Sequence, residues 1–455
     1  MRLPEPSSML SGMPLDHTLW PDTAAVNPAG GLLIAGCDLS RLAVEHGTPL
    51  YVLDEQTVCT TAEVFTAALG RYYPARSTVH YASKAFLNTA IAQLMVECGL
   101  GLDCVSLGEL SVARRAGVDL QAVHLHGNAK PPAELEQALA WGTGRIVVDS
   151  LDELQILDNI TAGYLSPQPV LLRLNPGIDV HTHAHVKTGH LDSKFGLPIA
   201  TGMAEAAVQR VLEAPGLRLM GLHMHLGSQI STLEPLGRGI TSLFEFAVAM
   251  RERFGWKMEE FSPGGGLAVP YAPGDPGPTV EEYVRLIAMA TVEAARATGA
   301  ALPRLVLEPG RALIARAVVA LYTVVAVKRI TDVRSFVAVD GGMGDNIRPA
   351  LYGARYHAVR ADRAGDPPAN IVTIVGRYCE SGDVLLRDIS MPPLDPGTRI
   401  VVPMAGAYTL SMASNYNLVP RPPLLLLREG QSFVIRRRET LDDLAVCDLP
   451  LPGRQ

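Results

Sequence analysis

The sequence has little charge and no long apolar run. Charged residues make up 19% of the 455 positions, below the roughly 25% usual for soluble domains, so a solvated or disordered tail is not expected to dominate. The longest uncharged apolar run, residues 317–327, is about half of the roughly 20 residues that cross a bilayer. We therefore expect no membrane partner, and we interpret this run as a buried strand.

Blocks of positive charge are also missing. Lys and Arg total 39 against 46 Asp and Glu, giving a net charge of −7, and no basic run is longer than residues 436–438. Nucleic-acid-binding proteins carry a concentrated basic surface. DNA and RNA are therefore not expected as partners.

Cysteine motifs are the third absence. The six cysteines include no CxxC pair and no spacing typical of a disulfide framework. The first 17 residues lack the apolar stretch of a signal peptide. Both absences predict a protein of the reducing cytoplasm.

Glycine and proline are abundant, with 42 and 34 residues, and predict many turns. Between them, short β-branched runs recur at an early spacing of about 22 residues, the length of one βα unit. These runs cover residues 78–82, 102–105, 122–126, 146–148, 170–174, 221–226 and 305–308. Helix signals fill the gaps: the apolar residues from Ile91 to Cys98 follow helical spacing, and Ser-x-x-Glu capping boxes begin at Ser106 and Ser150.

At least seven such units within about 270 residues favour an eightfold (β/α)8 TIM-like barrel, which we place at residues 46–315. From residue 316 the pattern changes to strands and turns without long helices. The strands are expected at residues 318–327, 336–339, 370–375, 399–403, 424–427 and 433–437. We predict a C-terminal antiparallel β domain over residues 316–455, joined by residues 1–45, which also lack helix signals.

Barrel enzymes carry catalytic residues at the C-terminal ends of their strands, and the strand predicted at residues 78–82 ends next to Lys84. A lysine in apolar surroundings has a lowered pKa and becomes a usable nucleophile, as imine-forming enzymes require. Alternatively, Lys84 is an ordinary lysine that extends its charged end from the strand into solvent. Taken alone, the residue leaves both interpretations open.

Three further elements could bind a phosphate. Gly264–Gly266 offers backbone N–H groups without Cβ obstruction, Gly227-Ser228 adds a hydroxyl, and Gly310-Arg311 adds an amide and a guanidinium. Each is a weak signal alone, because a triple glycine is more often a tight turn and this one lacks the lysine of a nucleotide P-loop. Together with Lys84 they indicate a phosphorylated, imine-forming cofactor, pyridoxal 5'-phosphate.

These motifs, in this order, resemble a known family. The resemblance is carried by Tyr81-Ala-Ser-Lys84-Ala, His223-Met-His225-Leu-Gly227-Ser228-Gln229, Gly264-Gly-Gly266, Glu308-Pro-Gly310-Arg311, Cys379-Glu380-Ser-Gly-Asp383 and Gly406-Ala-Tyr408. They look like the fold type III pyridoxal-phosphate decarboxylases, and residues 345–352 and 411–417 look like the diaminopimelate decarboxylases among them. The family fold, a βα barrel plus a β domain in a homodimer whose active sites span two subunits, agrees with the division predicted above.

For the cofactor, the resemblance implies that Lys84 binds it covalently, His225 stacks on its ring and Glu308 faces the ring nitrogen. A carboxylate there favours the protonated ring and its capacity to accept electrons. The phosphate would be bound by Ser228, Gly264, Gly265, Gly266, Gly310, Arg311 and Tyr408.

For the substrate, the resemblance implies decarboxylation of meso-2,6-diaminopimelate to L-lysine, the last step of that biosynthetic route. Cys379 of the neighbouring subunit would donate the proton that replaces the lost carboxylate. The distal end of the substrate would be held by Arg311, Arg348, Tyr352, Glu380 and Tyr408. Arginine beside a carboxylate suits a distal amino-acid centre, whereas lysine or ornithine would present only an ammonium.

Other interpretations stay open. The chain could be a related decarboxylase acting on another basic amino acid or on a specialised-pathway substrate. It could be an amino-acid racemase on the same barrel, although racemases usually place an arginine where Glu308 stands. It could also be a non-catalytic homologue, although such proteins lose the lysine, the phosphate-binding residues or the cysteine.

A few other residues carry less specific signals. The histidines at 181, 183, 185 and 190 could bind a metal, but no cysteine or carboxylate completes the set, so no metal site is expected. Asp103 either forms hydrogen bonds near the active site or only pairs with polar groups at the mouth of the barrel. Cys98 and Cys104 are expected to be small buried apolar residues.

Overall fold

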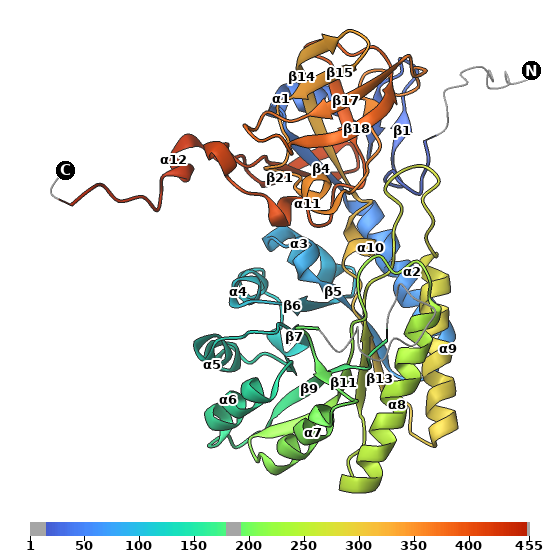
Figure 1. Ribbon diagram of the computed structural model, residues 1–455, viewed down its shortest axis with the longest axis vertical. Helices are drawn as coiled ribbons and strands as arrows, with labels where there is room; N and C mark the ends of the chain where they lie inside the picture. The colour runs from blue at the N-terminus through green and yellow to red at the C-terminus, as the bar shows by residue number, and fades with distance from the viewer. Residues whose placement is uncertain (1–14, 179–192, 453–455) are drawn as a thin grey trace, which may run out of the picture. The chain divides into compact units, whose positions relative to one another are not determined.

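The computed structural model, shown in Figure 1, describes residues 15–178 and 193–452. Its chain divides into two compact units. Within the described residues, unit 1 comprises residues 15–58, 270–275 and 314–452, and unit 2 comprises residues 59–178, 193–269 and 276–313. The chain passes from unit 1 to unit 2 inside the helix α2 (Glu55–Tyr72).

Eight parallel strands of unit 2 close into a barrel, which confirms the predicted (β/α)8 fold. They are β5 (Ser77–Ala82), β6 (Gly101–Cys104), β7 (Val123–Leu125), β8 (Arg145–Val148), β9 (Gln168–Asn175), β11 (Leu217–His223), β12 (Glu260–Gly264) and β13 (Arg304–Leu307). Pairing of β8 with β9 closes the ring, and the two-residue strand β10 (Leu197–Pro198) also pairs with β9.

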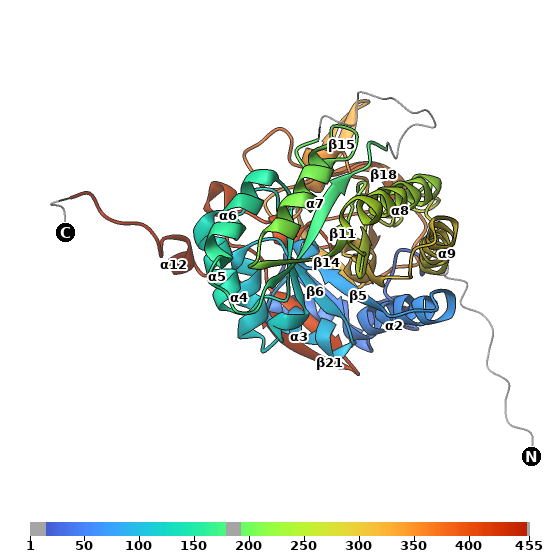
Figure 2. The same cartoon turned by 90° about the horizontal axis from the view of Figure 1, so that it is seen from below.

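Helices surround the barrel strands, as Figure 2 shows. After α2 they are α3 (Thr89–Glu97), α4 (Leu107–Arg115), α5 (Pro132–Ala140), α6 (Leu151–Thr161), α7 (Met203–Glu213), α8 (Glu234–Phe254), α9 (Val280–Thr298) and the short α10 (Arg311–Ile314). The serine half of each predicted capping box is formed: Ser106 and Ser150 accept hydrogen bonds from the backbone N of the residue three positions on. Both therefore begin a helix directly after a barrel strand.

Seven of the barrel strands coincide with predicted runs, and β12 does not. Its sequence, Glu-Phe-Ser-Pro-Gly, has no β-branched residue and contains proline, which hides a strand from a propensity argument. All five of its residues are buried. Its neighbour β11 approaches it so closely that a Cβ at Gly221 would lie 1.6 Å from the backbone oxygen of Glu260.

Unit 1 is a β domain, as predicted, but its main sheet is mixed rather than antiparallel. Its order is β18-β17-β15-β14-β4-β20-β21, with β19 pairing with β14 and β16. β4 and β20 are parallel, as are β15 and β17. Parallel neighbours need a long connection, and the whole barrel lies between β4 and β20 in the chain.

These strands are β4 (Leu50–Asp54), β14 (Val318–Ile330), β15 (Arg334–Val339), β16 (Val359–Arg360), β17 (Asn370–Val375), β18 (Val384–Met391), β19 (Arg399–Val402), β20 (Leu424–Arg428) and β21 (Gln431–Arg436). A small sheet is formed by β1 (Ala25–Val26), β2 (Leu32–Ile34) and β3 (Cys37–Asp38), followed by α1 (Leu39–His46); α11 (Arg348–Tyr352) and α12 (Leu441–Leu444) complete the unit. The apolar run interpreted as a buried strand is the first part of β14, which is buried as far as Tyr322, whereas Val325 is exposed.

The first boundary lies later in the chain than residue 46. β4 pairs with β14 and β20 rather than with the barrel, and all five of its residues are buried. A strand with a partner on each edge belongs to the sheet that buries it. Residues 47–58 are therefore part of unit 1.

Candidate active site

Lys84 lies directly after β5, in the short 3-10 turn Ser83–Ala85. Its side chain keeps accessible surface, whereas its neighbours Ala85 and Phe86 are buried. Protein atoms still surround the amine, and this loss of water lowers the pKa of Lys84 below its ordinary value; the charge of Arg173 lowers it further. A lowered pKa leaves more of the amine unprotonated at neutral pH, which is its nucleophilic form.

His225 follows β11 and lies beside the glycines that end β12. The backbone N of Gly265 donates to its Nδ1 over 3.3 Å, and a Cβ at Gly264 would lie 2.9 Å from the same nitrogen. Burial, with the charges of Lys84 and Arg173, lowers the pKa of His225 well below its ordinary value. The ring is therefore neutral, and such a ring can stack on another aromatic ring.

The three elements predicted to bind phosphate come together in unit 2. Arg311 Nη2 donates to Ser228 Oγ over 3.1 Å. A Cβ at Gly266 would lie 2.4 Å from the backbone oxygen of Gly227, and one at Gly265 would lie 2.1 Å from a backbone oxygen after β13. Any larger residue would clash there, so only glycine fits at both positions.

Gly310 lies directly before Arg311 and is also tightly packed. A Cβ there would lie 3.1 Å from Ala82 at the end of β5. This packing joins the Gly310-Arg311 turn to the strand that leads to Lys84.

Glu308 follows β13 and is buried. Its Oε1 accepts a hydrogen bond from Ser262 Oγ over 2.6 Å, and its Oε2 lies 3.0 Å from His223 Nε2. Burial, with the nearby charge of Asp103, raises the pKa of Glu308 to about 7. The carboxyl is thus close to half ionised at neutral pH, and a cation placed against it would hold it ionised.

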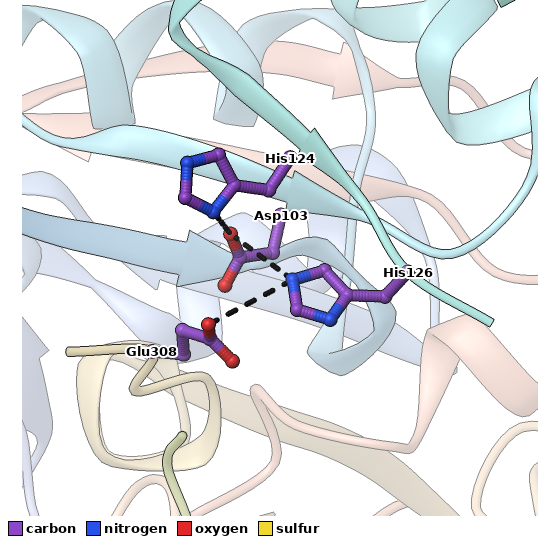
Figure 3. Close-up of side chains that lie close together, drawn as sticks. All are labelled: Asp103, His124, His126 and Glu308. Atoms are coloured by element: carbon purple, nitrogen blue, oxygen red, sulfur yellow. Dashed lines mark ion pairs between the residues drawn. The ribbon is translucent and has the colours of Figure 1, made fainter. Parts of the chain in front are cut away.

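Glu308 belongs to a buried network of charged and imidazole groups inside the barrel, drawn in Figure 3. His126 Nε2 lies 3.6 Å from Asp103 Oδ1 and 3.8 Å from Glu308 Oε1. His124 Nδ1 lies 3.8 Å from the same Asp103 oxygen. Asp103, whose role the sequence left open, is therefore a central member of this network.

The four residues of Figure 3 also have the composition of a metal site, since one ligand atom of each lies within 4.8 Å of the others. Their carboxylates already have partners: Asp103 Oδ1 lies 3.1 Å from His80 Nδ1, and both Glu308 oxygens are hydrogen-bonded. Although burial opposes it, the charges of His126 and His80 hold the pKa of Asp103 below its usual range. We interpret the cluster as a charge network, and the absence of a metal stays a prediction.

Cys379 and Glu380 lie in unit 1, in the loop between β17 and β18. The loop is fixed through its backbone: Asp383 Oδ2 accepts from the N of Tyr378 over 2.8 Å, and the N of Cys379 donates to Asn417 Oδ1 over 2.9 Å. The side chains of Cys379 and Glu380 are exposed. A rigid loop with an accessible thiol and carboxylate is suited to act on a bound molecule.

Arg348 and Tyr352 are the first and last residues of α11. Tyr352 is 63% exposed, whereas Arg348 is 5% exposed. Among the described residues, Arg348 forms no ion pair with a carboxylate; its Nη1 donates instead to the hydroxyl of Tyr356 over 2.5 Å. Arg348 is thus a buried cation whose charge is not neutralised.

The predicted residues fall into two groups. Unit 2 holds Lys84, His225, Ser228, Gly264, Gly265, Gly266, Glu308, Gly310 and Arg311, and unit 1 holds Arg348, Tyr352, Cys379, Glu380 and Tyr408. The structure brings the first group together at the C-terminal ends of barrel strands. In the second group, Tyr408 has a left-handed backbone, with φ of +58°, in the loop after β19.

Comparison with known proteins decides the family. Residues 58–315 match the family described as pyridoxal-dependent decarboxylase, pyridoxal binding domain. The chain is 44% identical over 444 residues to the diaminopimelate decarboxylase of Actinosynnema pretiosum subsp. auranticum, covering 96% of this chain and 97% of that protein. It is 40% identical over 430 residues to the diaminopimelate decarboxylase of Bacillus subtilis, covering 94% and 97%.

A solved structure agrees with the relatives. The crystal structure of diaminopimelate decarboxylase from M. jannaschii in co-complex with L-lysine matches with a TM-score of 0.90 at 33% identity, covering 95% of this chain and 99% of that one. This chain belongs to the diaminopimelate decarboxylase family. It is therefore a pyridoxal-dependent decarboxylase, and the predicted cofactor, pyridoxal phosphate, is confirmed.

The unit 2 residues fit the cofactor of this family. Lys84 offers an accessible amine with a lowered pKa. Glu308, buried and with a raised pKa, suits a protonated ring nitrogen. Arg311 donates a hydrogen bond to Ser228 Oγ, which brings a cation and a hydroxyl together as phosphate binding requires.

Sequence reasoning missed Arg173, which shapes the electrostatics around Lys84 and His225. It lies on β9, and its Nη1 is 3.7 Å from Asp149 Oδ1. Its charge lowers the pKa of both Lys84 and His225. A single arginine on a strand has no motif, so nothing in the sequence marked it. Ser262, the hydrogen-bond donor to Glu308, was hidden because β12 itself was not recognised.

Some predictions lie outside what the structure describes. The histidines at 181, 183, 185 and 190 fall in residues 179–192, outside the described residues. All six cysteines are described, and none forms a disulfide; Cys104 is buried as predicted, whereas Cys98 is partly exposed. Within residues 15–178 and 193–452, no helix combines the length and apolarity that crossing a bilayer requires.

Proposed function

We propose that this chain decarboxylates meso-2,6-diaminopimelate to L-lysine and carbon dioxide, the last step of lysine biosynthesis by the diaminopimelate route. Relatives across nearly its full length are diaminopimelate decarboxylases. The observation that carries the substrate assignment is the buried Arg348, which has no carboxylate partner among the described residues. A substrate with a distal carboxylate would supply that partner.

Pyridoxal phosphate, when bound, supplies an electron sink for the electron pair left as carbon dioxide departs. Lys84 would hold it, and Glu308 would keep its ring nitrogen protonated. His225 would cover one face of the ring, and Ser228, the glycines and Arg311 would bind the phosphate.

The residues of unit 1 would act on the substrate. Cys379 would donate a proton to the carbon that lost its carboxylate. Arg348 and Tyr352, with Arg311 and Tyr408, would hold the distal carboxylate, and the exposed Glu380 would take the distal ammonium.

We further propose a cytoplasmic homodimer in which each active site takes Cys379 from the neighbouring subunit. Mixing inactive Lys84→Ala and Cys379→Ala variants tests this arrangement. If sites are shared, random reassortment gives mixed dimers with one intact site and restores about a quarter of the wild-type activity. Mixtures that stay inactive after subunit exchange would contradict shared sites.

The substrate proposal is tested by incubating the holoenzyme separately with meso-diaminopimelate, L-lysine and L-ornithine and measuring carbon dioxide release. Only meso-diaminopimelate should be turned over. Turnover of lysine or ornithine but not of meso-diaminopimelate would contradict the assignment while leaving the family intact. Solvent-deuterium incorporation without gas release would instead favour a racemase.

Lys84→Ala should lower turnover at least about a thousandfold, because it removes the amine nucleophile. The purified variant should also lose the yellow colour of the covalently bound cofactor. Lys257→Ala, at an exposed lysine of unit 2, is the matched control and should keep both the colour and the activity.

A further inference from the structure

Arg348 is a buried cation without an anionic partner among the described residues. It is 5% exposed, its Nε is buried without a hydrogen-bond partner, and within the described residues it forms no ion pair. Buried charges are normally paired, because removing a charge from water is costly. Something other than a carboxylate therefore holds this guanidinium in place.

Two tyrosine rings do so. The Arg348 Cζ lies 4.2 Å from the ring centroid of Tyr271 and 5.5 Å from that of Tyr356. The two rings meet edge to face, with centroids 5.2 Å apart and planes at 80°. The Tyr356 hydroxyl also accepts the hydrogen bond from Arg348 Nη1. We call Tyr271 and Tyr356 the aromatic clamp.

The clamp is itself anchored. Asp275 Oδ2 accepts hydrogen bonds from the backbone N of Tyr271 and Ala272 over 3.1 and 2.9 Å, and Asp275 Oδ1 lies 3.2 Å from Arg355 Nη2. This ties residues 270–275 to the segment after α11. The carboxylate nearest the clamp in sequence is thereby engaged with Arg355 and is not a partner of Arg348.

Holding a cation by aromatic faces has a chemical consequence. A ring quadrupole attracts a guanidinium, typically by about 0.5–2 kcal/mol, yet carries no net charge. Burial also raises the pKa of Tyr356, so its hydroxyl stays neutral at physiological pH. A carboxylate in the same place would fix Arg348 equally well but would neutralise it and compete with any incoming anion.

We propose that Tyr271 and Tyr356 are specificity-determining positioning residues, which hold Arg348 oriented but un-neutralised so that it selects ligands with a distal carboxylate. This inference rests on the proposed function, because it assigns Arg348 to the substrate. It adds that selectivity depends on two tyrosines that act through Arg348.

L-lysine and cadaverine are the appropriate probes, because they differ only by one carboxylate. Their dissociation constants are measured by calorimetry with the holoenzyme of the wild type and of Tyr271→Leu, Tyr271→Phe and Tyr356→Phe. Tyr271→Leu should raise the Kd for L-lysine about tenfold, as expected from the loss of about 1.4 kcal/mol, and should change the Kd for cadaverine less than about twofold. Tyr271→Phe keeps the ring and should retain the preference for L-lysine.

Tyr356→Phe removes only the hydroxyl and should weaken L-lysine binding by a smaller factor. Tyr73→Phe is the matched control, since it removes one buried tyrosine hydroxyl bonded to Pro303 in unit 2; it should leave both constants unchanged. If Tyr271→Leu raised the Kd for L-lysine and for cadaverine by the same factor, or raised neither, the proposed role of the clamp would be wrong.

The failure of the proposed function has a different signature. If the wild type binds L-lysine no better than cadaverine and does not release carbon dioxide from meso-diaminopimelate, the substrate assignment is wrong and the clamp is overturned with it. If the wild type prefers L-lysine and releases carbon dioxide from meso-diaminopimelate, and the tyrosine variants keep the preference for L-lysine over cadaverine, only the proposed role of the clamp is wrong.

Discussion

Glu308 is a carboxyl group whose charge is costly to the folded protein. Burial raises its pKa from the ordinary 4.5 to about 7. Between these values the unfolded chain has lost a proton that the folded chain retains, so the contribution of Glu308 to stability falls as the pH rises through this window and stays low above it. A cofactor that brings a positive charge to this carboxyl would offset the cost.

We therefore expect Glu308→Gln to stabilise the cofactor-free protein at about pH 8, raising its Tm by a few degrees, and to have little effect near pH 4.5. Thermal unfolding of the wild type and the variant from about pH 4.5 to about pH 8 measures the difference in Tm. The exposed Glu293 of α9 provides the control, and Glu293→Gln should show no such pH dependence. A Glu308→Gln protein less stable than wild type at about pH 8 would show that the carboxylate is stabilised by its neighbours rather than strained.

At the scale of elements, the contact between β11 and β12 depends on one missing side chain. A Cβ at Gly221 would lie 1.6 Å from the backbone oxygen of Glu260, and backbone cannot move aside as the end of a flexible side chain can. The two strands would have to separate, which would disturb the barrel wall that carries His225 and Gly264.

Gly221→Ala should therefore destabilise the protein by about 3 kcal/mol or more, or prevent its folding. Gly237→Ala provides a contrast, because Gly237 lies inside α8 with nothing within 4 Å of its Cβ position. There alanine should stabilise the helix by about 0.5–1 kcal/mol. Urea unfolding of both variants measures their free energies of unfolding. A Gly221→Ala protein as stable as Gly237→Ala would contradict the close approach of β11 and β12.

The same elements show what sequence patterns can and cannot reveal. Strands with β-branched residues at βα spacing were recognised, and they were enough to predict the barrel. β12 was not, because its buried proline, serine and glycine form a strand only between β11 and β13. The mixed sheet of unit 1 was also missed, because the pairing of β4 with β20 joins segments too far apart for any local pattern.

The site divides in the same way. Lys84, the glycines and Arg311 have recognisable motifs, and the structure gathers them at one end of the barrel. Arg173 and Ser262 have none, since their roles depend on strands that meet only in three dimensions. The roles of Cys379, Glu380 and Tyr352 rest on family resemblance and stay predictions.

At the scale of the whole molecule, the barrel buries several imidazoles in their neutral form. Burial lowers the pKa of His124, His223 and His225 well below the ordinary 6.5. On acidification the unfolded chain takes up these three protons first, so the stability that they contribute is present above about pH 6.5 and is lost below it. Buried carboxyls act in the opposite direction, because burial raises the pKa of Glu109 and of Glu308 to about 7 and that of Asp345 to about 6.

Because the two sets of groups oppose each other, the contribution of one histidine is isolated by comparing the wild type with His124→Asn. The Tm of the wild type relative to that of His124→Asn should fall as the pH is lowered from about 7.5 to about 5, since asparagine cannot take up the proton that His124 gains on unfolding. Differential scanning fluorimetry of both proteins measures this difference in Tm. A difference that stays constant or moves the other way on acidification would mean that His124 is charged in the folded barrel.

The pairing of β4 with β14 and β20 also sets an order of events on the ribosome. β4 is synthesised before the barrel, and its five residues are all buried in the finished sheet. Its first partner, β14, emerges only after residues 59–313 have been made, and β20 emerges later still. Unit 2 can complete its fold during translation, but unit 1 cannot. Until then β4 is an unpaired apolar strand, the segment of the nascent chain most exposed to aggregation and best suited to chaperone binding.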